Sequence, residues 1–240
     1  MQQMSNHVFC DDFIAGLKLG TRLMPNPYLD YPYLLIENFL PEALCRDIAD
    51  YAKRESEAER ARVKSTVLGT IVAPDVDESI RKTIIRSLSD LHRDAYARSF
   101  ALHQQRIEEY FRIALTTATD VQVLEYTKGA FYIKHADDSN ELLNDRGETA
   151  GFLQVAPQRK ITTVLFATTY NPSLDGPFHF SGGGLRFNYL FDAEGDPITF
   201  YPKAGDMLVF PSNPIFSHEV LPVESGYRLT LVQWHNGIIA

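Results

Sequence analysis

A histidine and an aspartate lie two positions apart in the segment Tyr132-Ile133-Lys134-His135-Ala136-Asp137, and a second histidine, His218, follows far along the chain. In a β-strand, residues i and i+2 point to the same face, so His135 and Asp137 would present an imidazole and a carboxylate together. Two histidines and one carboxylate leave three coordination positions open, which suits a catalytic non-haem Fe(II) ion. By itself a His-x-Asp pattern carries little weight, because a surface pair of this kind arises by chance in many proteins of this size.

An arginine, Arg228, lies ten residues beyond His218 in a segment that alternates as a β-strand does. The alternation predicts one face carrying Arg228, Thr230, Val232 and Trp234. A turn is predicted over residues 222–226, and a hairpin centred there would set Arg228 beside His218. A buried guanidinium needs an anion, and its fork matches a carboxylate with two hydrogen bonds. The distal carboxylate of 2-oxoglutarate fits, with its 2-oxo acid end chelating the iron; the alternative is a structural salt bridge.

The first 118 residues have a mainly helical pattern. Pro41 begins an amphipathic helix, and a second, longer helix is predicted over residues 89–114. The many charged side chains of the second helix indicate a solvated face. Its two histidines, His92 and His103, have no partner at metal-ligand spacing, so we expect both at the surface.

After residue 118 the pattern changes to short strands separated by glycine and proline, which indicates a β-sandwich or barrel with helices packed on one side. We expect a single domain over residues 1–240, with 1–118 as mainly helical support and 119–240 as the catalytic core. The predicted strands cover residues 121–126, 161–167, 207–210 and 229–234.

The stretch 138–157 is polar and poorly periodic, so we expect a loop there. A loop of this length in a compact domain is usually functional, and this one is the best candidate for a substrate lid. Three nearby polar residues are weaker candidates for the site. Asp138 and His235 have the opposite parity to the predicted site residues, and His179 is expected at the surface.

The composition argues against some classes of partner. The chain has 240 residues, 45% of them apolar, and a net charge of −8 with a pI of about 5.4, which disfavours nucleic acid and anionic lipid as partners. Its two cysteines, Cys10 and Cys45, have neither metal-type spacing nor a disulfide framework. No signal peptide and no stretch of about 18 apolar residues is present, so we expect an intracellular, cytoplasmic protein without membrane contact.

Residues 121–236 resemble the prolyl 4-hydroxylase-like family of Fe(II)/2-oxoglutarate dioxygenases. The likeness rests on several spaced motifs rather than on the metal residues alone. Tyr126, Gly129, Tyr132, His135 and Asp137 match the family's Tyr-x2-Gly-x2-Tyr-x2-His-x-Asp run. The segment 182–187 is similar to its Gly-Gly-x-Leu strand, and 205–212, His218-Glu219-Val220 and Arg228 are similar to its second metal segment.

The resemblance implies a double-stranded β-helix, or jelly roll, supported by the N-terminal helices. It also implies Fe(II) as the metal, 2-oxoglutarate and O2 as cosubstrates, and ascorbate as a possible reductant. Phe166 stands where some members carry a cosubstrate-binding tyrosine, so that hydrogen bond is expected to be absent. The implied roles are iron ligation by His135, Asp137 and His218, cosubstrate binding by Arg228, Tyr126, Thr162 and Trp234, and substrate contact by Tyr132.

The expected reaction is hydroxylation of an amino-acid side chain, most simply prolyl, in a peptide, protein or free amino acid, with release of succinate and CO2. Two alternatives remain open at this stage. One is oxidative demethylation of nucleic-acid bases on the same scaffold, although that branch usually places a second arginine where this chain has Trp234. The other is a non-enzymatic jelly-roll sensor or binding module.

Overall fold

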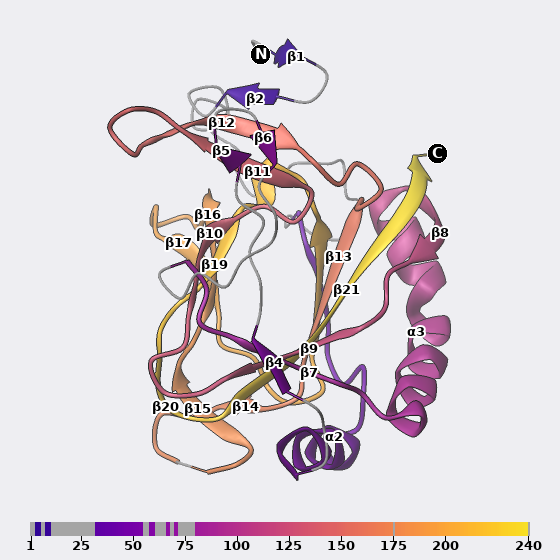
Figure 1. The fold of residues 1–240 in the computed structure, drawn as a ribbon. Helices are drawn as coiled ribbons and strands as arrows, with labels where there is room; N and C mark the ends of the chain where they lie inside the picture. Colours follow the sequence, from indigo (N-terminus) through magenta and orange to yellow (C-terminus); the bar gives the residue numbers. More distant parts are fainter. Residues whose placement is uncertain are drawn as a thin grey trace.

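The computed structural model describes residues 3–5, 8–10, 32–54, 58–60, 66–67, 70–71, 80–174 and 176–239. Within these ranges two antiparallel sheets face each other, and two helices, α2 and α3, pack against the outer face of the larger sheet (Figure 1). The segments that build one sheet come from distant parts of the chain, so the fold depends on long-range pairing.

The larger sheet has eight strands. Its hydrogen-bonded order is β3-β18-β13-β21-β9-β7-β4, and β8 pairs with the far end of the long strand β21. These strands are β3 (Leu34–Ile36), β4 (Ala58–Arg60), β7 (Ile84–Arg86), β8 (Ile113–Ala118), β9 (Gln122–Tyr126), β13 (Ile161–Phe166), β18 (Met207–Pro211) and β21 (Arg228–Ile239).

The smaller facing sheet has the order β10-β19-β16-β17, and a short three-stranded sheet, β14-β15-β20, lies beside it. The strands are β10 (Tyr132–His135), β16 (Leu185–Phe191), β17 (Pro197–Phe200), β19 (His218–Val220), β14 (Thr169–Tyr170), β15 (His179–Gly182) and β20 (Val223–Gly226). A 3-10 helix, η1 (Pro214–Phe216), leads directly into β19.

Two further sheets complete the described strands. One has the order β1-β2-β12-β11 and lies at the top of Figure 1, and the other is the pair β5-β6. Their strands are β1 (Gln3–Ser5), β2 (Val8–Cys10), β11 (Ser139–Leu143), β12 (Thr149–Gln154), β5 (Thr66–Val67) and β6 (Thr70–Ile71).

Alternation along the strands of the larger sheet creates two separate apolar layers. On β13, Leu165 packs outward with the helices, while Val164 and Phe166 pack inward against the smaller sheet. The same parity along β21 sends Leu229 and Leu231 outward. Because each buried apolar side chain contributes about 1.5–3 kcal/mol, both layers oppose any slip in register that would exchange the two faces.

The two helices are α2 (Glu42–Arg54) and α3 (Asp90–Phe111), close to their predicted ranges. Ser89 is the N-cap of α3, since its hydroxyl accepts a hydrogen bond from the backbone N–H of His92. The expectation that His92 is at the surface was wrong. Its ring is buried, with Nδ1 2.8 Å from Ser89 Oγ and Nε2 2.9 Å from Asp47 Oδ2, so it joins the two helices.

The loop predicted over residues 138–157 was also wrong. The segment is a hairpin of β11 and β12, and β2 extends it by pairing with β12. Phe152 on β12 is fully buried against Ala136 and Tyr189. No clear strand pattern is present in the sequence here, because the segment is mostly polar and Phe152 is its only fully buried large apolar residue.

The other predictions about the fold agree with the structure in large part. The jelly-roll class is confirmed by the two facing antiparallel sheets, and all four predicted strands are present. The first 118 residues supply two helices, as expected, but also β3, β4, β7 and β8 of the larger sheet. Of these strands, β3, β4 and β7 have three residues each and are too short to detect by periodicity. The division into support and catalytic core remains a prediction.

None of the helices in the described ranges has the length and apolar character required to span a lipid bilayer.

A matched pair of glycines tests how tightly the fold packs around the turn before β18. Gly205 and Gly147 both have a positive φ, of 96° and 77°. A Cβ at Gly205 would overlap the carbonyl oxygen of Leu40, whereas nothing lies within 4 Å of one at Gly147. We expect Gly147→Ala to cost about 1 kcal/mol of unfolding free energy and Gly205→Ala about 3 kcal/mol. Urea unfolding of the two variants measures the difference, and equal losses would contradict the close packing.

Candidate metal centre

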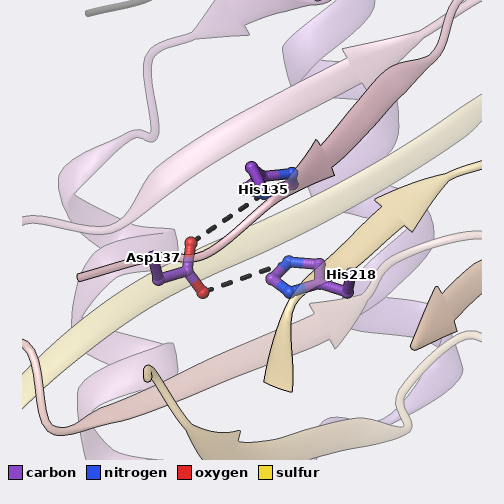
Figure 2. A group of neighbouring side chains, drawn as sticks. All are labelled: His135, Asp137 and His218. Atoms are coloured by element: carbon purple, nitrogen blue, oxygen red, sulfur yellow. Dashed lines mark ion pairs between the residues drawn. The ribbon is translucent and has the colours of Figure 1, made fainter. Parts of the chain in front are cut away.

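His135, Asp137 and His218 converge from two neighbouring strands. In the antiparallel pair β10–β19, His135 is directly opposite His218. Asp137 lies between them, with Oδ1 4.0 Å from His135 Nε2 and Oδ2 4.0 Å from His218 Nε2 (Figure 2). All three ligand atoms lie within 4.8 Å of one another, which is the separation expected of groups that share one metal ion. No other group of three or more such residues occurs in the described part of the chain.

Each imidazole is oriented by a backbone carbonyl two residues earlier. His135 Nδ1 is 2.9 Å from the oxygen of Ile133, and His218 Nδ1 is 3.0 Å from that of Phe216, whose position η1 determines. A carbonyl only accepts, so Nδ1 carries the proton and Nε2 offers its lone pair to the centre. Burial, reinforced by the nearby His218, lowers the pKa of His135 to about 3, which keeps this imidazole neutral and able to bind a metal at neutral pH.

Asp137 lies just beyond the end of β10, in a bend rather than in the strand assumed from the sequence. Its side chain is nevertheless fixed, because Thr162 Oγ1 donates a 2.7 Å hydrogen bond to Oδ2 and itself contacts Ser212 Oγ at 2.8 Å. Arg159 Nη1 donates to the backbone oxygen of Asp137 at 2.8 Å. Burial opposes ionisation here, but the surrounding imidazoles, Thr162 and Arg159 outweigh it, and the pKa of Asp137 lies below its ordinary value.

Arg228 is a buried cation without an anion in the described part of the protein. It is 1% exposed, and its Nε and Nη1 have no hydrogen-bond partner. The guanidinium lies 4.7 Å from the ring centre of Tyr126, the residue directly opposite it on β9. Burial lowers the pKa of Arg228 to about 10, while its interactions with Tyr126 act in the opposite direction, so the group remains charged at neutral pH.

The hairpin predicted to bring Arg228 beside His218 was wrong. Residues 223–226 form β20, which pairs with β15, and β19 and β21 belong to different sheets. His218 and Arg228 instead approach the same space from opposite walls. The predicted face of β21 was right, since Arg228, Thr230, Val232 and Trp234 all point into that space.

The space is a cavity of about 330 Å³ between the two sheets. It is lined by the three candidate ligands and by Arg228, so a cation site and an anion site share one volume. A group that chelates a metal at one end and carries a carboxylate at the other fits this arrangement. The two orphaned guanidinium nitrogens of Arg228 are the observation that tests the fit, because a buried, unpaired donor is costly unless a ligand satisfies it.

Comparison with known proteins agrees with a metal site and a carboxylate site in one cavity. Residues 121–236 match the family model described as the 2OG-Fe(II) oxygenase superfamily. The part of the chain that carries the triad and Arg228 is thus identified with this superfamily. It is therefore a dioxygenase that uses Fe(II), 2-oxoglutarate and O2. Among curated proteins, none matches the sequence.

Solved structures of oxygenases share the fold. A prolyl-4-hydroxylase from Pseudomonas putida has 24% identity and a TM-score of 0.57, with 85% of this chain and 92% of that chain covered. A prolyl hydroxylase from Trichoplax adhaerens, solved with a hypoxia inducible factor peptide, has 16% identity and a TM-score of 0.54 over 85% and 83%. The viral collagen prolyl hydroxylase of Paramecium Bursaria Chlorella virus-1 has 18% identity and a TM-score of 0.52 over 86% and 96%.

The structure places the other predicted site residues in or against the cavity of this oxygenase. Tyr126, Tyr132, Thr162 and Trp234 all line it. Tyr132 stacks on His135 at 3.6 Å between ring centres. The Thr162 hydroxyl is directed at Asp137, which makes it a positioning group for the metal ligand, and its predicted contact with the cosubstrate remains a prediction.

Two arginines and one serine of the site were not predicted from the sequence. Arg81 and Arg159 line the cavity, and Ser212 supports Thr162. Arg159 carried a weak signal, as a basic residue just before the buried strand β13, whereas nothing in the sequence around Arg81 indicates its position.

Three residues that the sequence pattern did not favour as site residues lie outside the cavity, as expected. His235 faces α3 and stacks on Phe100 at 4.5 Å. Asp138 is buried and accepts hydrogen bonds from Ser139 and Gln154, so it is a structural carboxylate. His179, expected at the surface on a loop, is half-buried within β15.

Two neighbouring threonines on β13 allow a test of whether Thr162 positions Asp137. Thr162→Val preserves shape but removes the hydrogen bond to Asp137 Oδ2, so we expect Fe(II) affinity to fall about 10- to 100-fold while the protein stays folded. Thr163 points to the other face, where its hydroxyl contacts Tyr96 and His235. Thr163→Val should lower stability without changing metal affinity. Anaerobic Fe(II) titration with thermal unfolding as the control measures both, and equal affinities of the two variants would refute the role.

Proposed function

We propose that this oxygenase hydroxylates a prolyl residue in a peptide, a protein or the free amino acid, with release of succinate and CO2. Support comes from the likeness to three structures whose names describe prolyl hydroxylases. The single observation that carries the proposal is the pairing, in one cavity, of a candidate metal triad with a buried arginine that has no anionic partner among the described residues.

His135, Asp137 and His218 would hold Fe(II), which when bound supplies the activation of O2. The protein's part is to direct Nε2 of both imidazoles inward, to keep His135 neutral and to keep the Asp137 carboxylate ionised. The carbonyls of Ile133 and Phe216 orient the rings, burial keeps His135 neutral, and the hydroxyl of Thr162 supports the ionised carboxylate. All three side chains line the cavity, so an ion that they held would be accessible from it.

Arg228 and Tyr126 would bind the distal carboxylate of 2-oxoglutarate. Nε and Nη1 of Arg228 both lack a partner, so the guanidinium has donors left for a carboxylate. The rings of Tyr126, Phe166 and Phe180 surround the guanidinium at 4.7, 5.6 and 5.9 Å, exclude water and hold its charge in place. A dry, preoriented site of this kind binds the cosubstrate in a fixed direction toward the metal.

Base demethylation is the weaker candidate. Trp234 occupies the position where that branch carries a second arginine, and the chain has a net charge of −8. Non-specific affinity for a phosphate backbone depends on positive charge, so this balance disfavours nucleic acid.

Turnover on prolyl substrates tests the proposed reaction. Purified protein with Fe(II), ascorbate and 2-oxoglutarate is expected to release succinate and to add one oxygen atom to a proline-containing peptide or to proline, as measured by mass spectrometry. The His135→Ala variant is the control, and it should form neither product because one ligand is lost. Succinate formation without a gain of oxygen on any prolyl compound would reject the substrate class but keep the oxygenase.

Arg228 should control the requirement for cosubstrate. Arg228→Gln removes the charge but keeps part of the side-chain volume, and we expect the KM for 2-oxoglutarate to rise about 100-fold, from the loss of roughly 3 kcal/mol of charge-assisted hydrogen bonding. Fe(II) affinity in the absence of 2-oxoglutarate should change little, because Arg228 contacts none of the three ligands. An unchanged KM would contradict the carboxylate role.

A further inference from the structure

Two arginines that the proposed reaction does not use, Arg81 and Arg159, line the same cavity as the metal triad. Both lie near the Tyr132 hydroxyl: burial raises the pKa of Tyr132, and the positive charges of Arg81 and Arg159 each counteract that rise. The charge of Arg159 also lowers the pKa of Asp137, and that of Arg81 lowers the pKa of His135. Both guanidinium groups therefore lie close to Tyr132 and to the candidate metal ligands.

An aromatic ring holds each of these guanidinium groups. The Cζ atom of Arg81 lies 4.6 Å from the ring centre of Tyr132, and that of Arg159 lies 3.9 Å from the ring centre of Trp234. Arg159 is fixed further by its hydrogen bond to the backbone oxygen of Asp137. Groups held in this way lose little conformational entropy when an anion binds between them.

Neither arginine is neutralised within the described residues. Neither forms an ion pair with an aspartate or glutamate side chain there, and the buried Nε of each has no hydrogen-bond partner. Arg81 is only 8% exposed, so water compensates little for its missing partners. By contrast, Arg86, on the next strand, is paired with Glu125 at 2.9 Å. Among the described residues, the structural Arg86 thus has a carboxylate partner, whereas Arg81 and Arg159 have none.

The charges of the cavity support an anionic substrate. Fe(II) and a doubly ionised 2-oxoglutarate cancel each other, and Asp137 is the only carboxylate among the described residues that line the cavity. Its single negative charge offsets one of the three guanidinium groups, Arg81, Arg159 and Arg228. Two positive charges then remain. A neutral substrate would leave both uncompensated in a largely enclosed space, which is costly.

We propose that the substrate carries a carboxylate next to the residue that is oxidised, and that Arg81 and Arg159 bind it. This inference rests on the proposed function and specifies its substrate. The carboxylate is either the α-carboxylate of a free or C-terminal amino acid or the side chain of an adjacent acidic residue, and both sources offer the same planar anion to the two guanidinium forks.

A nucleic-acid phosphate fits these residues less well. Enzymes that act on an extruded base stack it between aromatic side chains. Here Arg81 and His135 lie against the ring of Tyr132, and Arg159 lies over Trp234, so these aromatic faces of the cavity are already occupied.

Matched pairs of ligands that differ only in the carboxylate test the proposal. N-acetyl-L-proline is compared with N-acetyl-L-prolinamide, and a peptide with glutamate beside proline is compared with its glutamine form. Each Kd is measured by calorimetry with the protein loaded with Fe(II) and 2-oxoglutarate under anaerobic conditions, so that no turnover occurs. We expect the carboxylate form of at least one pair to bind ten times more tightly or better, and the pair that responds identifies the source.

Variants link this preference to the two arginines. Arg81→Gln is expected to bring the Kd values of acid and amide together, whereas Arg81→Lys should keep part of the difference. Arg98→Gln, which removes an exposed arginine on α3, is the matched control and should leave the ratio unchanged. Should Arg81→Gln fail to fold, Arg159→Gln provides the same comparison, and in the unmodified protein the ratio should shrink as salt is added.

Equal affinity for acid and amide in both pairs would overturn the proposal, as would a preference that survives in both Arg81→Gln and Arg159→Gln. Tighter binding of a single-stranded oligonucleotide than of either acid would overturn it in favour of a phosphate ligand. If the acids bind preferentially but no prolyl compound gains oxygen in the turnover assay, the carboxylate site stands and only the prolyl assignment fails.

Discussion

The buried positive charge of Arg228 is the constraint around which the rest of the site is arranged. A guanidinium that is 1% exposed and has no anion beside it among the described residues is costly in a folded protein, and the faces of three aromatic rings compensate only in part. A carboxylate bound there, as we propose for 2-oxoglutarate, would compensate the rest. A charge held in place before the cosubstrate binds favours affinity, because little has to be reordered on binding.

The two facing sheets place the candidate metal centre opposite this charge. Strands β10 and β19 of the smaller sheet supply the two histidines, while β21 of the larger sheet supplies Arg228 from the facing wall. The larger sheet is held in register by two apolar layers, one under the helices and one shared with the smaller sheet. A shift of one residue would turn Arg228 outward. Helices α2 and α3 do not contribute to the cavity lining, but they cover the outer face of the larger sheet and so fix the parity of β13 and β21.

Supporting hydrogen bonds hold the three candidate metal ligands in one fixed arrangement. Thr162 and Ser212 hold the Asp137 carboxylate, and Arg159 holds its backbone, so the ligand that lies outside regular structure is the one with the most support. The histidines, which lie in paired strands, need only one carbonyl each. Arg159 also reaches Trp234, which connects the metal side of the cavity with the arginine pair that we assign to the substrate.

The sequence by itself determined the features that depend on local spacing. The motif spacing identified the triad, Arg228 and the superfamily, and period-two alternation gave the inward face of β21 and the outward face of His235, because alternation is a property of a single strand. Tertiary structure alone decided which strands are neighbours. It placed Arg228 across from His218 rather than beside it, buried His92 against Asp47 and formed the hairpin β11–β12. It also brought Arg81 and Arg159 to the cavity. These features depend on contacts between residues far apart in sequence, whose energies come from packing and charge compensation that no local pattern records.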